Sequence, residues 1–267
     1  MGPASASMRL SGGGLRERLR DTLVYLLGWP ALVLQQDVPA WDRWRWLRRE
    51  LRPGALRTLD AGSGSGAFAI YAAERGNVVL GLSFDESANQ RAARRASLLG
   101  VRRVGFRRAD LRQLDEIAPE LGGFDQIICL EVIEHILQDQ KLLVDLAGLL
   151  RPGGRLLIST PWSGHRPLVG ETLSDVEDGG HVRWGYTHER LASLMEGAGL
   201  EVIGHTYMTG VLGQRITNLS RRVERLAGSQ VAWAVTLPFR LALLLDRPVT
   251  RLLRYPWLAI AAVGVKP

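Results

Sequence analysis

Cysteine, lysine and long apolar runs are scarce in this 267-residue chain. Its one cysteine, Cys129, excludes an internal disulfide and fits a reducing compartment. The apolar segments 22–34 and 231–245 fall short of the roughly 20 residues that a helix needs to span a bilayer. Residues 1–14 are rich in Ser and Gly and lack the apolar core of a secretory signal. We therefore expect a flexible tail there and a cytoplasmic protein whose contact with the inner membrane face, if it has one, is peripheral.

The charge is strongly one-sided. The formal net charge is +7, and all but two of the 34 basic residues are arginines. One interpretation is a bias in the nucleotide composition of the source genome. The other is attraction to nucleic acid or to an anionic membrane surface. With 46% apolar and 23% charged residues, the composition itself predicts a packed globule.

A regular alternation of apolar runs and helical patterns follows residue 54. Strands are predicted at 56–60, 78–83, 104–108, 124–130, 154–160, 200–207 and 257–265. Helices are predicted at 66–75, 87–99, 112–119, 137–150 and 188–197, with a helical segment at 210–256. Such alternation is typical of an α/β fold with a doubly wound, mostly parallel sheet that binds ligands at the C-terminal strand ends. We predict seven strands, of which the last is antiparallel.

A glycine-rich loop follows the first strand. Asp60-Ala61-Gly62-Ser63-Gly64-Ser65-Gly66-Ala67 satisfies the dinucleotide fingerprint G-x-G-x-x-G/A. That fingerprint expects an acid at the end of the second strand, where this chain has Ser83. A carboxylate at position 60 would also repel a pyrophosphate, whereas it suits a cationic ligand. These two observations argue against a nicotinamide cofactor.

The loop resembles motif I of class I S-adenosylmethionine-dependent methyltransferases. Further segments match the family in order, namely Gly81-Leu82-Ser83, Ala109-Asp110-Leu111, Phe124-Asp125-Gln126-Ile127-Ile128 and Leu150-Arg151-Pro152-Gly153-Gly154. The resemblance covers residues 54–208 and the last strand. It implies a cofactor-binding core at 54–209 completed by residues 257–267, a tail and helical cap at 1–53, and a helical insertion at 210–256 that shapes the acceptor site.

The resemblance also implies roles for individual residues. It assigns the methionyl part of the cofactor to Asp60, Gly62, Gly64 and Gly66, the adenine to Asp110 and Leu111, and the surroundings of the sulfonium to Glu131. Asp110 can alternatively be a helix N-cap. Ser83 departs from the acid that most of the family uses for the ribose, as in cyclopropane-fatty-acid synthases. Either Asp85 reaches back to the ribose, or the cofactor is bound more weakly.

A second constellation follows the fourth strand. Glu131-Val132-Ile133-Glu134-His135 resembles the E-x-x-E-H segment of ubiquinone-biosynthesis O-methyltransferases and small-RNA 2′-O-methyltransferases. The resemblance implies that Glu131, Glu134, His135 and His181 could bind Mg²⁺ or Zn²⁺. The same segment also occurs in methyltransferases without a metal, so His181 as a general base is an equal alternative, with His135 and Glu131 beside it. His165 is interpreted as a loop residue without catalytic work.

The segments outside the core favour a hydrophobic acceptor. Residues 15–51 and 210–256 are rich in Leu, Trp and Arg, and the helix at 40–51 either packs inward with its tryptophans or lies against lipid headgroups. We predict O-methylation of a hydrophobic small molecule or a lipid-like acceptor. An RNA methyltransferase is a second hypothesis, disfavoured because no RNA-binding module is appended and the basic residues alternate with leucine. A non-catalytic cofactor-binding protein is the third.

Overall fold

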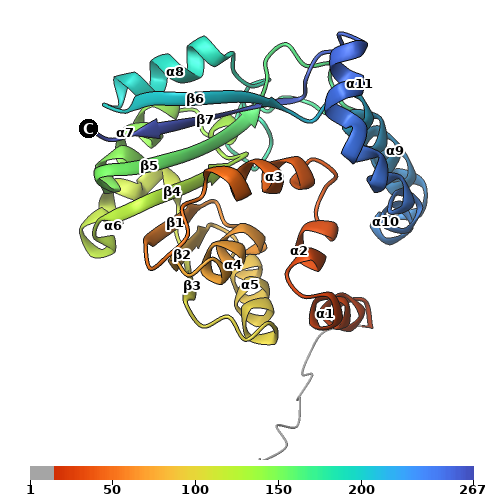
Figure 1. The fold of residues 1–267 in the computed structure, drawn as a ribbon, viewed down its shortest axis with the longest axis horizontal. Coiled ribbons are helices and arrows are strands. Elements are labelled where there is room, and N and C mark those ends of the chain that lie inside the picture. Colours follow the sequence, from red (N-terminus) through yellow and green to blue (C-terminus); the bar gives the residue numbers. More distant parts are fainter. Residues whose placement is uncertain (1–14) are drawn as a thin grey trace, which may run out of the picture.

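The computed structural model describes residues 15–267, so the predicted tail at 1–14 lies outside the described residues. A seven-stranded sheet forms the centre of the molecule, in the order β3-β2-β1-β4-β5-β7-β6 (Figure 1). The strands are β1 (Arg57–Ala61), β2 (Val78–Ser83), β3 (Val104–Arg108), β4 (Phe124–Leu130), β5 (Leu150–Pro161), β6 (Glu201–Met208) and β7 (Ala259–Val265).

The strand directions confirm the predicted fold class. Strands β1 to β5 run parallel, whereas β7 is antiparallel to both β5 and β6. Strand β5 begins four residues earlier than predicted, because an irregularity in the β4 register lets Leu150 pair with Phe124. From β1, the chain first adds β2 and β3 on one side of the sheet and then adds β4 and β5 on the other. At this switch in strand order, Asp60 of β1 pairs with Gly81 on one side and Ile128 on the other. In sheets of this kind, ligands bind at that switch.

Helices cover both faces of the sheet (Figure 1). The core helices are α4 (Ala67–Glu74), α5 (Glu86–Leu98), η1 (Leu111–Gln113), α6 (Leu114–Leu121), η2 (Ile133–His135), α7 (Asp139–Leu149) and α8 (His188–Gly197). Preceding them are α1 (Leu15–Leu27), α2 (Pro30–Leu34) and α3 (Ala40–Glu50). The segment between β6 and β7 forms α9 (Val211–Ala227), α10 (Ser229–Thr236), η3 (Pro238–Leu245) and α11 (Asp246–Leu252).

The three N-terminal helices share a hydrophobic core with the sheet. The chain breaks between α1 and α2, since Gly28 has φ +70° and Pro30 begins α2. Trp29 stacks on Tyr71 of α4 at 4.6 Å between ring centroids and lies 5.5 Å from Trp44 of α3. Trp46 is buried. Helix α3 therefore packs inward with its tryptophans and positions the segment before it at the strand ends.

Among residues 15–267, every helix is too short or too polar to cross a lipid bilayer.

Candidate active site

Two adjoining cavities lie at the C-terminal ends of the parallel strands. The first, here called the cofactor cavity, has about 460 Å³ and contains most of the residues that the sequence assigned to the adenosyl part of the cofactor. Its lining includes Gly62, Gly64, Ser83, Phe84, Asp110, Leu111 and His135. The second, the acceptor cavity, has about 370 Å³. His135 lines both, so the two cavities meet at the E-x-x-E-H segment.

Asp60 is a buried carboxylate without a matching cation. The residue is the last but one of β1 and is 3% exposed, and Oδ2 has no hydrogen-bond partner among the described residues. Burial raises the pKa of this carboxyl to about 7, and a hydrogen bond from the backbone of Ala69 only partly opposes the shift. A cationic ligand at this position would favour the ionised form. The residue therefore fits the ammonium and sulfonium charges of S-adenosylmethionine.

The glycines of the loop are required for different steric reasons. Gly62 has φ +91°, and a Cβ there would lie 2.3 Å from Cγ2 of Val132, so the loop passes directly against the segment after β4. A Cβ on Gly66 would lie 2.5 Å from Ala92 and 2.9 Å from Phe106. Gly66 is the N-cap of α4 and lies outside the cavity lining, so in this structure it serves the packing of α4 and α5.

The end of β2 presents Ser83, not Asp85, to the cofactor cavity. Ser83 is buried, and its hydroxyl accepts a hydrogen bond from the backbone N–H of Asp85. The Asp85 carboxylate caps α5 by accepting from the N–H of Ser87 at 2.8 Å and lies outside the cavity lining. Phe84, exposed and in the lining, was missed by sequence reasoning. Its position directly after the second strand was the sequence signal that could have indicated a lining residue.

Asp110 is a helix N-cap and also lies in the wall of the cofactor cavity. It caps η1 by accepting from the backbone N–H of Arg112, and it also lines the cofactor cavity. The guanidinium of Arg112 donates to the same carboxylate at 2.8 Å and 3.0 Å. These hydrogen bonds lower the pKa of Asp110, despite some burial. The group is therefore a fixed, ionised acceptor at the cavity wall.

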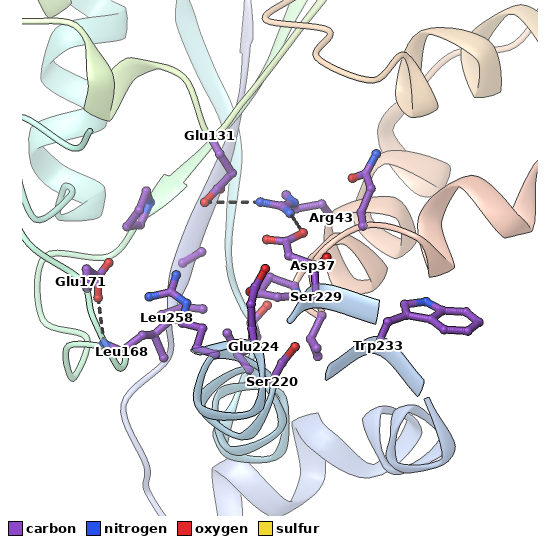
Figure 2. Close-up of a pocket in the computed structure, with 18 of the residues that line it drawn as sticks. Asp37, Arg43, Glu131, Leu168, Glu171, Ser220, Glu224, Ser229, Trp233 and Leu258 are labelled. Carbon is purple, nitrogen blue, oxygen red and sulfur yellow. Dashed lines mark hydrogen bonds and ion pairs between the residues drawn. The ribbon is translucent and has the colours of Figure 1, made fainter. Parts of the chain in front are cut away.

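The acceptor cavity is bounded by the segment before α3, the strand ends, the loop after β5 and the helices of the insertion (Figure 2). Arg43 of α3 reaches Glu131, with 3.6 Å between Nη1 and Oε2, and also pairs with Asp37. Glu131 has φ +55°, a conformation that L-residues rarely adopt, and accepts from the Ser159 hydroxyl at 2.8 Å. Sequence reasoning missed Arg43, because nothing distinguishes it from the other arginines of this chain.

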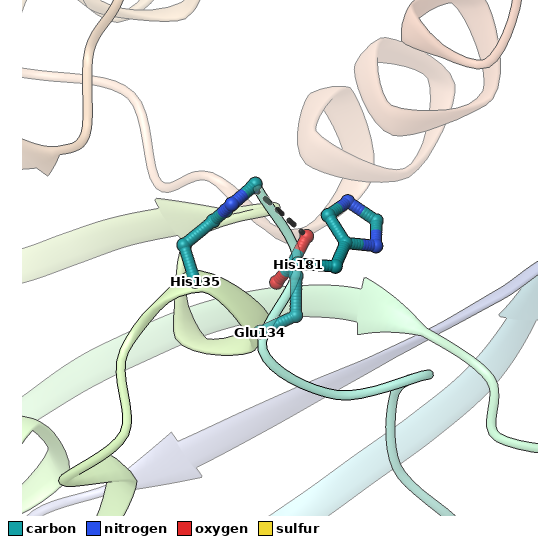
Figure 3. A group of neighbouring side chains, drawn as sticks. All are labelled: Glu134, His135 and His181. Atoms are coloured by element: carbon teal, nitrogen blue, oxygen red, sulfur yellow. Dashed lines mark ion pairs between the residues drawn. The ribbon is translucent and has the colours of Figure 1, made fainter. Parts of the chain in front are cut away.

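Glu134, His135 and His181 form a compact group (Figure 3). One ligand atom from each lies within 4.8 Å of the others, whereas Glu131 is outside this group. Nδ1 of His135 lies 2.9 Å from the carbonyl oxygen of Gly180, which favours the tautomer with a free Nε2. Oε1 of Glu134 and Nδ1 of His181 are buried without a hydrogen-bond partner among the described residues.

The protonation states at this group follow from burial. Burial and the charge of Glu131 raise the pKa of Glu134 well above its ordinary range. Burial and the neighbouring His135 lower the pKa of His181. At neutral pH, His181 is therefore a neutral imidazole that can accept a proton.

Glu171 connects His181 to a second histidine. Its Oε1 lies 3.8 Å from Nδ1 of His181, and its Oε2 lies 3.1 Å from Nε2 of His165. His165 is buried and also contacts the carbonyl oxygen of Trp162 through Nδ1. Sequence reasoning missed Glu171 and treated His165 as an ordinary loop residue, because the loop that carries them has no periodic pattern.

Comparisons with known proteins agree on one family. A family model described as a methyltransferase domain matches residues 15–205. The ubiquinone biosynthesis O-methyltransferase of Xanthomonas axonopodis pv. citri is 28% identical over 72% of this chain and 81% of that protein. The enzyme of the same name from Dechloromonas aromatica is 30% identical over 43% of this chain and 48% of that protein. The chain thus spans only about half the length of some curated relatives that it matches.

Solved structures support the fold. Phosphoethanolamine N-methyltransferase 2 of Haemonchus contortus, in complex with S-adenosylmethionine, superposes with a TM-score of 0.56 at 22% identity. The match covers 83% of this chain and 51% of that one.

Proposed function

Because the chain belongs to the methyltransferase-domain family and is an S-adenosylmethionine-dependent methyltransferase, we propose that it methylates a hydroxyl oxygen of a hydrophobic, lipid-like acceptor. The observation that carries the proposal is the neutral imidazole of His181, whose Nδ1 makes no hydrogen bond among the described residues and which lines the acceptor cavity close to its junction with the cofactor cavity. An oxygen nucleophile needs such a proton acceptor. The relatives named as ubiquinone biosynthesis O-methyltransferases support the choice of oxygen.

The residues assigned to the cofactor act in two ways: some supply charge or polar contacts, and the glycines leave space against the backbone. Asp60 would hold the positive charge of S-adenosylmethionine, while Gly62 and Gly64 let the cofactor lie against the backbone. Asp110 and Leu111 would contact the adenine, and Ser83 would contact the ribose in place of an acid. The bound cofactor supplies an activated methyl group on a sulfonium. The remaining requirements are positioning of the acceptor oxygen and removal of its proton.

His181 would take the proton of the acceptor hydroxyl. Glu171, 3.8 Å from the same imidazole, would stabilise the protonated form and orient the ring. Glu131 is fixed between Ser159 and Arg43 at the boundary of the acceptor cavity, where it would face the reacting oxygen. Both Glu131 and His181 are thus preorganised by neighbouring side chains. This arrangement fits a reaction whose catalysis is mainly positioning.

A divalent ion held by Glu134, His135 and His181 is a second candidate for activating the hydroxyl. The support is the 4.8 Å grouping, the unpartnered Oε1 of Glu134 and the free Nε2 of His135. Two imidazoles and one carboxylate suit Zn²⁺ better than Mg²⁺, which prefers oxygen ligands. Metal analysis after dialysis, followed by an assay with and without EDTA, tests this candidate. Metal-free protein with full activity would remove it.

The insertion supports a membrane-resident acceptor. Large apolar side chains on η3 and α11 are exposed, with Leu241 75% and Leu252 83% accessible. Exposed arginines, including Arg251 and Arg254, lie in the same segment. Apolar side chains next to cations are the combination that binds an anionic lipid surface. We therefore place a peripheral membrane contact on the insertion, next to the acceptor cavity.

Transfer of a labelled methyl group tests the proposed function. The protein is incubated with methyl-labelled S-adenosylmethionine and, separately, with a bacterial lipid extract, a set of hydroxylated aromatics and total RNA. We expect label in the lipid extract as an ether that resists mild alkali. Label in RNA alone would establish the RNA hypothesis instead. Binding of the cofactor without transfer to any fraction would favour a non-catalytic protein.

A further inference from the structure

A third cavity, rich in arginine, adjoins the acceptor cavity. This arginine cavity has about 580 Å³ and lies between α1, the end of α2, α5 and the start of α10. Its lining comprises Arg20, Asp21, Gln35, Gln36, Ser65, Arg91, Arg94, Arg95, Ser229 and Gln230. Four of these residues, Arg20, Gln35, Gln36 and Ser229, also line the acceptor cavity. A molecule in the acceptor cavity could therefore extend into the arginine cavity.

The arginine cavity has an excess of positive charge. Among the described residues of the lining, four arginines face one acid, Asp21, which forms an ion pair with Arg94 at 3.0 Å. Arg91 donates to the Ser87 hydroxyl at 2.8 Å, and its only ion pair is a long, exposed contact of 3.5 Å with Asp85 among the described side chains. Arg95 is 8% exposed and donates to two neutral acceptors, the Ser65 carbonyl and the Gln35 amide oxygen. Among the side chains that the structure describes, from residue 19 onward, Arg95 forms no ion pair.

A buried guanidinium with neutral partners is unfavourable unless an anion joins it. Burial lowers the pKa of Arg95; Asp21 opposes the shift, and the charges of Arg20, Arg91 and Arg94 add to it. The first turn of α10 also faces this cavity through Ser229 and Gln230, and no side chain caps its backbone N–H groups. Guanidinium forks and a helix N-terminus both favour phosphate. Helices α1, α5 and α10 thus direct positive charge or hydrogen-bond donors into the arginine cavity.

We propose that the arginine cavity binds a phosphate group of the acceptor while the acceptor hydroxyl lies next to His181. The inference rests on the proposed function, and it specifies the acceptor as a phosphate-bearing molecule. The phosphate would be the counter-ion that pairs with Arg95, and it would contact Arg20 and Arg91 at the exposed side of the cavity. Gln35 and Gln36 lie in the linings of both cavities, so the acceptor would pass along them.

Direct binding of inorganic phosphate to the full chain tests the inference. The protein is saturated with S-adenosylhomocysteine and titrated calorimetrically at low ionic strength. The test variant is the double substitution Arg20→Gln and Arg91→Gln, chosen because both side chains are exposed and their loss leaves the buried Arg95 in place. The matched control is Arg102→Gln with Arg190→Gln, which removes two exposed charges outside the cavity lining. We expect at least tenfold weaker phosphate binding in the test variant and less than a twofold change in the control.

Three outcomes would overturn the inference. They are the absence of phosphate binding to the unaltered protein, an equal loss in the control, and a parallel loss of S-adenosylmethionine affinity in the test variant. The last would assign the arginines to the cofactor carboxylate. Binding is measured without turnover, so the two hypotheses can be tested separately. A protein that binds phosphate but methylates no acceptor would support the phosphate site and contradict the proposed function.

The source of the phosphate is resolved by two further probes, dihexanoyl phosphatidic acid and glycerol 3-phosphate. Tighter binding of the short-chain lipid by tenfold or more identifies a lipid headgroup. Equal binding identifies a small soluble phosphate. Either result, with the same loss in the test variant, supports the site. If neither probe binds, the inference is wrong.

Discussion

Asp60 shows how a single residue couples cofactor binding to stability. In the cofactor-free protein, burial raises the pKa of its carboxyl to about 7, far above that of an exposed aspartate. The folded state therefore favours the protonated form. The stability that this group contributes is full below about pH 4 and is lost as the pH rises to about 7. A cationic cofactor restores stability by pairing with the ionised form.

The variant Asp60→Asn separates the two effects. We expect it to lose cofactor binding, because it lacks the negative charge. We also expect its free energy of unfolding, without cofactor, to exceed that of the unaltered protein by up to about 4 kcal/mol above pH 7 and to equal it near pH 4. Urea unfolding at both pH values, with calorimetric titration of the cofactor, measures this. The control Asp125→Asn, an exposed partner of Arg151, should show no gain, and equal pH profiles for Asp60→Asn and the unaltered protein would contradict the argument.

The lowered pKa of His181 predicts where the rate falls on the acid side of the pH–rate profile. Burial and His135 lower its pKa, so the neutral, proton-accepting form persists below pH 6.5, the ordinary value for histidine. Turnover should therefore fall only below that pH. His181→Gln should reduce kcat by about 100-fold or more and remove this limb, with cofactor affinity unchanged. A limb that survives in the variant would assign the titration to another group.

At the scale of elements, the two ends of the insertion are joined to each other by the capping of one helix. The carboxylate of Asp246 at the start of α11 accepts from the backbone N–H groups of Gly210 at 2.6 Å and Leu212 at 2.8 Å. The hydroxyl of Thr250 accepts from Val211 at 2.8 Å. Helix α9 therefore begins in a buried site whose donors are satisfied by α11. Without these contacts, the helices that border the acceptor cavity would lose their anchor.

Asp246→Ala should destabilise this anchor. Two buried N–H groups would lose their acceptor, and the carboxylate would no longer complement the N-terminus of α9. We expect about 2 kcal/mol less stability, because relief of repulsion with Asp42 offsets part of the loss. Chemical denaturation measures it, and hydrogen exchange should localise the loss to residues 210–256. Asp175→Ala, an exposed loop variant, is the control; a uniform loss across the sheet would contradict a local anchor.

At the scale of the whole molecule, one side of the insertion combines exposed leucines with positive charge. We expect the protein to co-sediment with vesicles that contain phosphatidylglycerol and to be released by salt. The double substitution Leu241→Ser and Leu252→Ser should weaken this binding by about tenfold, since both side chains are largely exposed. Leu226→Ser, which removes an exposed leucine from α9, is the control. No binding at moderate salt would remove the membrane contact.

The sequence by itself determined the fold class and the family. Strand and helix periods act over a few residues, so β2, β3 and β4 appear at their predicted bounds. The acid and glycines after β1 are likewise contiguous, and their chemistry can be interpreted without a partner. The family that the motif order indicated is confirmed by the match to residues 15–205.

Only the tertiary structure decided which distant side chains meet. Arg43 faces Glu131 across 88 positions of sequence, and Glu171 reaches His181 from an irregular loop. The arginine cavity needs α1, α5 and α10 together, although no segment of the chain distinguishes its arginines from the others. Such contacts depend on how helices pack over the sheet, and that packing leaves no periodic trace in the sequence. Local patterns therefore predicted the strands, the helices and the candidate cofactor loop, while packing created the candidate acceptor cavity.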